Sequence, residues 1–141
     1  MPGFLEFPRD PQIVRQLMPS LEISAQGMAT QMQFLEIISA NIANAETTRT
    51  PEGGPYQRKV GIAESDAATG GTATHVVADE RPGQIVYDPG HPDANAEGFV
   101  EYPNVDINTE LVDLMITRRI HDANATVFQA AKGMLKRALE I

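Results

Sequence analysis

The sequence predicts a mainly α-helical fold with a small β insert, in which the N- and C-terminal helices pair as a coiled coil. Two observations indicate this fold. Apolar residues recur with heptad spacing near both ends of the chain, and glycine, proline and acidic residues gather between them. The expected division is an N-terminal extension at 1–20, a first helix at 21–46, a connector and acidic insert at 47–104, and a second helix at 105–141.

The first predicted helix carries one apolar seam. Its positions alternate between spacings of four and three residues: Leu21, Ala25, Met28, Met32, Leu35, Ser39 and Ile42. Ser20, which follows Pro19, is expected to accept hydrogen bonds from the free N–H groups of the first turn. Asn41 and Asn44 lie three residues apart and share a face at the other end. Their amides either cap the last carbonyl groups or bridge to a neighbouring chain.

The second predicted helix carries two apolar seams. Asp106 or Asn108 is expected to cap it, and three basic residues near its end complement the helix dipole. No proline interrupts it, so about 35 residues would span about 50 Å. One seam runs through Ile116, Ile120, Ala123, Val127, Ala130, Met134 and Ile141, with Arg137 filling the gap. The other runs through Ile107, Leu111, Leu114, Arg118, His121, Ala125, Phe128, Lys132, Leu135 and Leu139.

Two seams on one helix are more than a single partner helix requires. Apolar surface left exposed in this way usually marks an interface, so the pattern points to assembly with further chains. Spacing alone allows a second explanation, in which the middle segment folds over one seam within the same chain.

The segment between the helices is acidic and rich in turns. Residues 61–104 contain eight acidic side chains and one basic side chain, Arg81, and so carry nearly all of the formal net charge of −8. The segments 72–77 and 84–87 flank turn residues and are predicted to form a hairpin. Residues 66–71, with two adjacent glycines, are predicted to be a mobile loop. Weak strands are also expected at 57–63 and 98–102.

Composition excludes several classes of function. The chain has no cysteine, so it forms no disulfide and offers no thiol nucleophile or thiolate metal site. Its negative charge argues against binding to nucleic acid or to an anionic membrane surface. No run of 18 apolar residues predicts a membrane span. The first ten residues do not resemble a cleavable secretory signal, so we expect the protein to remain inside the cell or to leave by another route.

One cluster suggests enzymatic chemistry. Asp88, His91 and Asp93 lie within six residues and could hold a hard or borderline metal ion. A turn explains the same residues, because aspartates commonly bond to the backbone of turns. His121 lies on a helical seam without a suitable partner for acid–base catalysis. We therefore expect no catalytic, cofactor-binding or metal site.

Three separated motifs resemble those of the flagellar axial proteins, the family of rod and hook subunits. The first is SANIANAETT at 39–48, which continues as RTPEGGPY at 49–56. The other two are YDPGHPDA at 87–94 and GFVEYPNV at 98–105. The resemblance covers residues 23–141 and is strongest to the proximal rod, because all three motifs occur in order.

The resemblance implies a non-enzymatic structural subunit of a torque-transmitting drive shaft. In this family the subunits stack helically, with the terminal helices in the inner layer and the insert facing outward. The implied partners are other copies of the chain, other rod proteins, and components of the inner-membrane ring and export gate. The implied location is the basal body in the periplasmic space, after type III export without a cleaved signal. No cofactor, nucleic acid or small-molecule substrate is expected.

The residues expected to pack between helices and subunits come from both seams and from the two asparagines. They are Met28, Met32, Leu35, Asn41, Ile42, Asn44, Leu111, Leu114, Ile116, Ile120, Ala123, Val127, Phe128 and Met134. Two other interpretations stay open. A cytoplasmic coiled-coil adaptor with an acidic insert would share the heptads, and a metal-dependent enzyme would use Asp88, His91 and Asp93.

Overall fold

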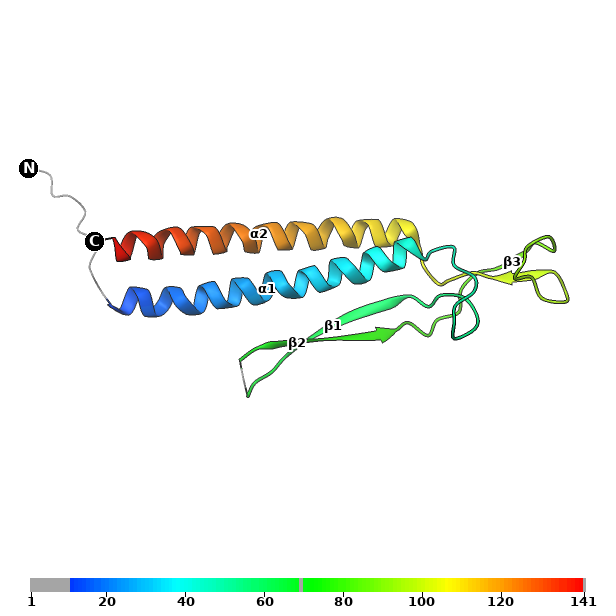
Figure 1. The fold of residues 1–141 in the computed structure, drawn as a ribbon, viewed down its shortest axis with the longest axis horizontal. Helices are drawn as coiled ribbons and strands as arrows, with labels where there is room; N and C mark the ends of the chain where they lie inside the picture. Colours follow the sequence, from blue (N-terminus) through cyan, green and yellow to red (C-terminus); the bar gives the residue numbers. More distant parts are fainter. Residues whose placement is uncertain (1–10, 69, 141) are drawn as a thin grey trace, which may run out of the picture.

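The computed structural model describes residues 11–68 and 70–140 as two long helices joined by a small β insert. The helices lie side by side and run antiparallel, and the insert leaves the pair at one end (Figure 1). This confirms a mainly α-helical fold with a small β insert. The elements are α1 (Pro11–Ala43), β1 (Lys59–Ser65), β2 (Thr72–Ala78), β3 (Ile85–Tyr87), β4 (Phe99–Glu101) and α2 (Ile107–Leu139).

Helix α1 begins ten residues before the predicted start, so residues 11–20 do not form a separate extension. Half-buried Val14 and Leu17 continue the apolar stripe toward the N-terminus and favour the longer helix. Pro19 lies inside the helix. The hydroxyl of Ser20 donates to the carbonyl of Gln16 at 3.3 Å, so Ser20 is an interior residue, not the N-cap. Residues 1–10 of the predicted extension lie outside the described residues.

Helix α2 follows its predicted signals closely. The carboxylate of Asp106 caps the N-terminus by accepting from the backbone N–H of Asn108 at 3.0 Å. Lys136 and Arg137 lie in the last turn, where they complement the helix dipole. Buried and half-buried positions recur at alternating spacings of four and three: Glu110, Leu114, Thr117, His121, Asn124, Phe128, Ala131, Leu135 and Ala138.

The insert contains two separate antiparallel hairpins, and the predicted hairpin between 72–77 and 84–87 is wrong. Strand β1 pairs with β2, from Lys59 opposite Ala78 to Ser65 opposite Thr72. Strand β3 pairs with β4. Strands β2 and β3, which flank the expected turn, do not pair with each other. The side chain of Asn104 donates to the carbonyls of Asp79 and Arg81, both at 2.9 Å, and so fixes the connecting segment as a crossing between hairpins.

The hairpins take different directions from the end of the helix pair. Hairpin β1–β2 runs back beside α1, whereas β3–β4 continues past the helix ends (Figure 1). The predicted loop at 66–71 is the turn of the first hairpin, where the N–H of Asp66 donates to the carbonyl of Gly71 at 2.8 Å.

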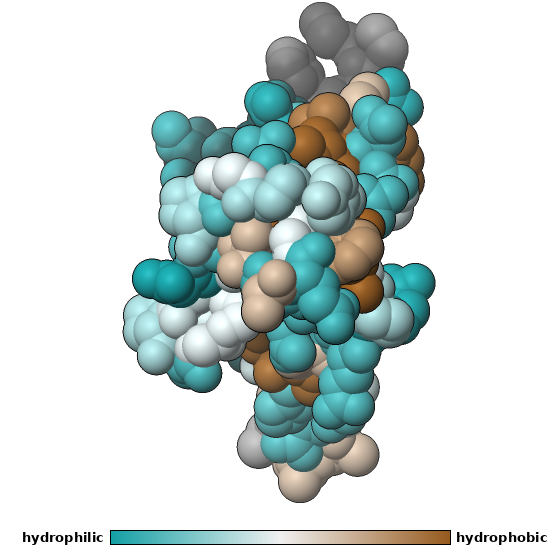
Figure 2. All heavy atoms as spheres, turned by 90° about the vertical axis from the view of Figure 1, so that its right-hand side faces the viewer, coloured by the Kyte–Doolittle hydropathy of each residue, from teal (hydrophilic) through white to brown (hydrophobic). Residues whose placement is uncertain are grey.

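The hydrophobic interior of a single chain is small. Among the described residues, Val100 and Ala131 are the hydrophobic side chains that form the buried core, and many large ones remain exposed. Seen from the insert end, hydrophobic residues lie between hydrophilic ones on the surface (Figure 2). No described helix has the combination of length and apolar character that a membrane span needs. A chain with so little interior and so much exposed apolar surface fits association with other chains.

Candidate functional site

The end of α1 is joined to β1 through the side chain of Asn41. The backbone N–H of Lys59 donates to Oδ1 of Asn41 at 2.9 Å, and Nδ2 of Asn41 donates to the carbonyl of Lys59 at 2.8 Å. An antiparallel strand would satisfy the same two groups of one residue in this way. Asn41 is only 1% exposed, so its amide serves as an internal partner for the edge of the hairpin.

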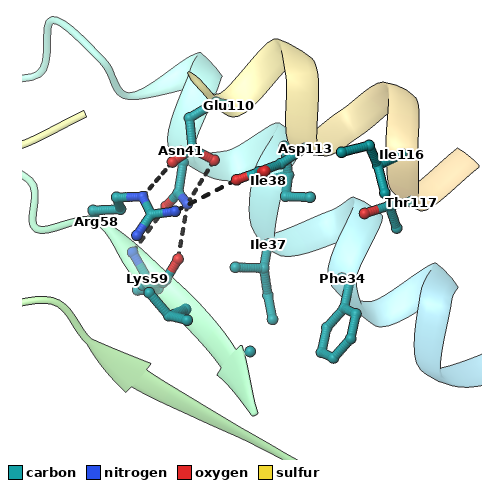
Figure 3. A pocket seen from close by; sticks show the side chains of 12 residues that line it. Phe34, Ile37, Ile38, Asn41, Arg58, Lys59, Glu110, Asp113, Ile116 and Thr117 are labelled. Atoms are coloured by element: carbon teal, nitrogen blue, oxygen red, sulfur yellow. Dashed lines mark hydrogen bonds and ion pairs between the residues drawn. The ribbon is translucent and has the colours of Figure 1, made fainter. Parts of the chain in front are cut away.

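Glu110, in the first turn of α2, completes this contact. Its side chain is 1% exposed and forms an ion pair with Nε of Arg58. Its second oxygen accepts from Nδ2 of Asn41 at 3.3 Å. Arg58 also lies 3.4 Å from a carboxylate oxygen of Asp79 and 3.7 Å from one of Asp113. Figure 3 shows Arg58 beside Asn41 and Glu110, with dashed lines that mark the hydrogen bonds and ion pairs. The hydrogen bond to Glu110 raises the pKa of Arg58, so the guanidinium stays charged.

Tyr56 adds a third hydrogen bond to the amide. Its hydroxyl donates to Oδ1 of Asn41 at 2.9 Å. Burial, and secondarily the charge of Glu110, raises the pKa of Tyr56 above its usual range. No buried side-chain nitrogen or oxygen within 11–68 and 70–140 lacks a hydrogen-bond partner. We call this cluster, made of Asn41, Tyr56, Arg58, Lys59 and Glu110, the polar junction; it joins α1, β1 and α2.

A second set of contacts secures the start of the other hairpin. The backbone N–H of Arg58 donates to Oδ1 of Asn104 at 2.8 Å, and Asn104 in turn holds the crossing segment. Arg81 binds Asp79 through its side chain and its backbone N–H. These bonds, with a smaller contribution from Arg58, hold the pKa of Asp79 well below its usual range. Both hairpins are therefore tied to the polar junction.

Beside the junction, β1 packs closely on α1. A Cβ on Gly61 would lie 2.5 Å from the ring of Phe34 and 3.0 Å from Cδ1 of Ile37. A cavity of about 180 Å³ lies between the strand and the helices, and Ile116 and Thr117 line it from α2. The charged groups at its polar end, Arg58 and Glu110, bind each other. This arrangement suits the fixing of three elements relative to one another.

The structure separates the residues predicted for packing into two groups. Met28, Leu35, Ile42, Leu114 and Phe128 are half-buried. The others named on the two helices are largely exposed: Met32, Leu111, Ile116, Ile120, Ala123, Val127 and Met134. Asn41 makes its hydrogen bonds within the chain, and Nδ2 of Asn44 donates to the carbonyl of Ala40 at 2.8 Å, as a capping amide does. A role of these residues between subunits stays a prediction.

Four residues of the polar junction were not among the site residues predicted from the sequence: Tyr56, Arg58, Lys59 and Glu110. One signal could have indicated Glu110. It occupies the seam position that precedes Leu114 and Thr117, and a carboxylate on a buried seam needs a cationic or donor partner. No comparable signal identifies Arg58, because its partner lies 52 residues away.

His91 and Asp93 of the candidate metal cluster form hydrogen bonds and an ion pair with other residues of the chain. Nδ1 of His91 accepts from the backbone N–H of Asp93 at 3.0 Å. The carboxylate of Asp93 lies 2.9 Å from Nε of Arg49 and accepts from the hydroxyl of Thr48 at 2.5 Å. Within the residues that the structure describes, no group of three His, Asp or Glu side chains is placed to hold a metal ion. Asp93 thus attaches the connector after α1 to the turn before β4.

Comparison with known proteins agrees with these features. Residues 21–49 match the family model described as "Flagella basal body rod protein", and residues 96–141 match "Flagellar basal body rod FlgEFG protein C-terminal". The flagellar basal-body rod protein FlgC of Bacillus subtilis is 38% identical, over 86% of this chain and 95% of the relative. The FlgC proteins of Salmonella typhimurium and Borreliella burgdorferi are 35% and 33% identical, each over 89% of this chain and 97% of the relative. The chain therefore belongs to the FlgC family of flagellar basal-body rod proteins.

Proposed function

We propose that the protein is a structural subunit of the bacterial flagellar basal-body rod, in its proximal part, and that it polymerises through its terminal helices. In this role it forms part of the torque-transmitting drive shaft needed for motility. The observation that carries the proposal is an exposed apolar stripe along helix α2. We call this stripe the free face of α2; it consists of Ile116, Ile120, Ala123, Val127 and Met134.

The free face is too exposed to be explained by contacts within one chain. Its four larger side chains are between 43% and 58% exposed: Ile120, Ile116, Val127 and Met134. The insert lines a cavity with Ile116 but leaves the rest of the stripe open. The second explanation of the two seams was that the middle segment folds over one of them. The insert does not cover the free face in this way, so that explanation does not account for the stripe. A neighbouring subunit would cover it.

The neighbouring side of α2 supports a coiled-coil pairing with α1. Its buried and half-buried positions follow the heptad spacing of four and three. The helices also approach closely, because a Cβ on Gly27 would lie 2.8 Å from Nδ2 of Asn124. In this proposal the inner seam holds one subunit together, and the free face holds subunits to each other.

The partners proposed from family membership are other copies of the chain, other rod proteins, and the inner-membrane ring and export gate. The proposed location is the basal body in the periplasmic space, reached through the flagellar export apparatus without cleavage of a signal. A structural, non-enzymatic role fits the polar junction, whose charged groups bind each other.

The proposal is tested by placing a charge on the free face. Ile120→Asp or Val127→Asp should leave export of the chain intact but abolish rods in purified basal bodies, and with them swimming. Gln129→Asp is the matched control, because Gln129 is exposed on another side of α2 and should tolerate the charge. Normal swimming of the Ile120 and Val127 variants would refute the proposal.

Two further measurements separate the rival interpretations. A cytoplasmic adaptor would be absent from purified basal bodies, whereas a rod subunit would be recovered in them. A metal-dependent enzyme would contain metal after purification and would lose function in His91→Ala. We expect no bound metal and normal motility in cells that carry His91→Ala.

A further inference from the structure

The hairpin β3–β4 presents an apolar face to solvent. Cross-strand partners lie on the same side of a sheet, as do residues two apart on a strand. Ile85 therefore shares a face with Tyr87, with its partner Glu101, and with Phe99, the partner of Tyr87. Ile85 is 68% exposed and Tyr87 is 65% exposed. We call this surface the hairpin face. It is the side away from Val100, which is fully buried.

Acidic residues surround this apolar centre. Glu101 lies on the hairpin face itself, and Asp88 and Glu97 follow β3 and precede β4. All three are exposed, and none forms an ion pair with another residue of 11–68 or 70–140. Contact between Tyr87 and Phe99, with ring centroids 5.3 Å apart, orders the apolar centre. The hairpin face thus combines ordered aromatic area with unneutralised negative charge.

The C-terminal end of α2 has the complementary character. Lys132, Lys136 and Leu139 are spaced by four and three residues and so lie on one side of the helix. All three are exposed, and Leu139 is 70% exposed. Lys136 lies 3.9 Å from Glu140, a loose contact between two exposed groups. This end therefore offers apolar area beside positive charge.

The two surfaces lie at opposite ends of an elongated molecule (Figure 1). Hairpin β3–β4 projects beyond the helix pair at one end, and α2 terminates at the other, so the surfaces cannot meet within one chain. A contact between different surfaces of identical chains can repeat from copy to copy, and it builds an open helical filament where the rotation between copies does not close a ring.

We propose that the hairpin face of one copy docks on the C-terminal end of α2 in a second copy. The inference rests on the proposed function, because it assumes that copies of the chain lie in one assembly. Ile85 and Tyr87 would cover Leu139, and the acidic residues around them would face Lys132 and Lys136. Apolar contact supplies the attraction, and the charges fix orientation and exclude the reversed arrangement, which would bring like charges together.

Cross-linking between two tagged copies tests the contact directly. The chain has no cysteine, so Tyr87→Cys in one copy and Leu139→Cys in the other are the only reactive thiols of the protein. Purified basal bodies from cells that express both copies are treated with a short bismaleimide linker. We expect a product with both tags, about tenfold above a control that pairs Ala67→Cys with Leu139→Cys, because docked residues react at a high effective concentration.

The outcomes distinguish this inference from the function on which it rests. Both copies in the basal bodies, without product above the control, would overturn the docking contact and leave the rod function intact. Linkage of Tyr87→Cys to a different protein only would overturn the choice of a second copy. Absence of both copies from basal bodies would overturn the rod function and the contact together.

Charge exchange provides a second test at exposed positions of the two surfaces. Glu97→Lys with Glu101→Lys should reduce the number of rods about tenfold, because attraction becomes repulsion at each contact. Lys132→Glu with Lys136→Glu should do the same, and combination of all four changes in one chain should restore assembly. Glu52→Lys with Glu80→Lys, which changes net charge equally, is the control and should assemble normally. Failure of the combined variant to recover would contradict the contact.

Discussion

The first turn of α2 and the rest of the helix differ in the kind of contact that their side chains offer. At its first turn, Glu110 is buried and every bond that it makes is completed within the chain, by Arg58 and Asn41. From Ile116 onward, one side of the same helix is apolar, exposed and without such partners. The difference teaches how one helix serves both folding and assembly. The hydrogen bonds and ion pair of Glu110 fix the position of the insert within the chain. The exposed apolar side of the helix remains available for contact with neighbouring subunits.

The contrast also predicts how each region responds to substitution. A buried charge that loses its partner is costly to the isolated chain. An exposed apolar residue that becomes polar costs the isolated chain almost nothing, and its effect emerges only in the assembly. The changes below test this contrast in order of decreasing effect on the stability of the isolated chain.

Glu110→Ala should have the largest effect. It leaves the guanidinium of Arg58 without its main partner and removes an acceptor from Asn41, so we expect a loss of about 3–5 kcal/mol in the free energy of unfolding. Urea denaturation of the purified chain measures the loss. Glu140→Ala, which removes an exposed carboxylate at the C-cap of α2, is the control and should change stability little. Equal stability of the two variants would show that the junction does not hold the fold.

Gly61→Ala should have an intermediate effect, because the new methyl group would overlap the ring of Phe34 and press on Ile37. We expect a loss of about 1–3 kcal/mol and displacement of β1 from α1, visible in the urea midpoint and in hydrogen exchange at β1. Gly133→Ala is the matched control. A Cβ there meets nothing within 4 Å, so the change should stabilise α2 by about 1 kcal/mol.

Tyr56→Phe should cost about 1 kcal/mol, the value of one hydrogen bond to Asn41. The native chain should also be sensitive to alkaline pH. Because the folded chain raises the pKa of Tyr56, the stability linked to this group is fully present below about pH 10 and is lost as the pH rises through the folded value. Tyr56→Phe should remove this component of the pH dependence. An unchanged alkaline profile in the variant would argue against the role of the phenol.

Ile120→Asp should have the smallest effect on the isolated chain, within about 0.5 kcal/mol, because the side chain is already exposed. The same substitution is expected to abolish rods in cells. Urea denaturation and isolation of basal bodies from the same strain give both results. A large loss of stability would place Ile120 in the interior of the chain and remove the contrast between the two regions.

Periodic patterns predicted the helices well, because each seam is a property of neighbouring turns. The cap at Asp106 follows from local chemistry in the same way. The start of α1 was missed because Pro19 and Ser20 together resemble a helix start. In the structure the helix continues through both residues, and the hydroxyl of Ser20 bonds backward to Gln16.

Contacts between distant residues could not be predicted from local patterns. Strands of three to seven residues do not specify their partners, and the crossing that separates the hairpins depends on Asn104, which lies 23 and 25 residues from the groups that it binds. The partner of Asn41 lies 18 residues along the chain. Which seam of α2 meets α1 was equally open, because both are apolar; buried Glu110, Thr117 and Ala131 mark the inner side only once the fold is known.

The antiparallel arrangement of the helices has a practical consequence for labelling. Because α1 begins and α2 ends at the same end of the molecule, labels attached at these two helix ends would crowd the same region (Figure 1). That region includes Lys136 and Leu139. The turn between β1 and β2 is a better site for a tag, since Ala67 and Ala68 are exposed there. A short epitope after Ala67 would report on the protein inside living cells while it still assembles.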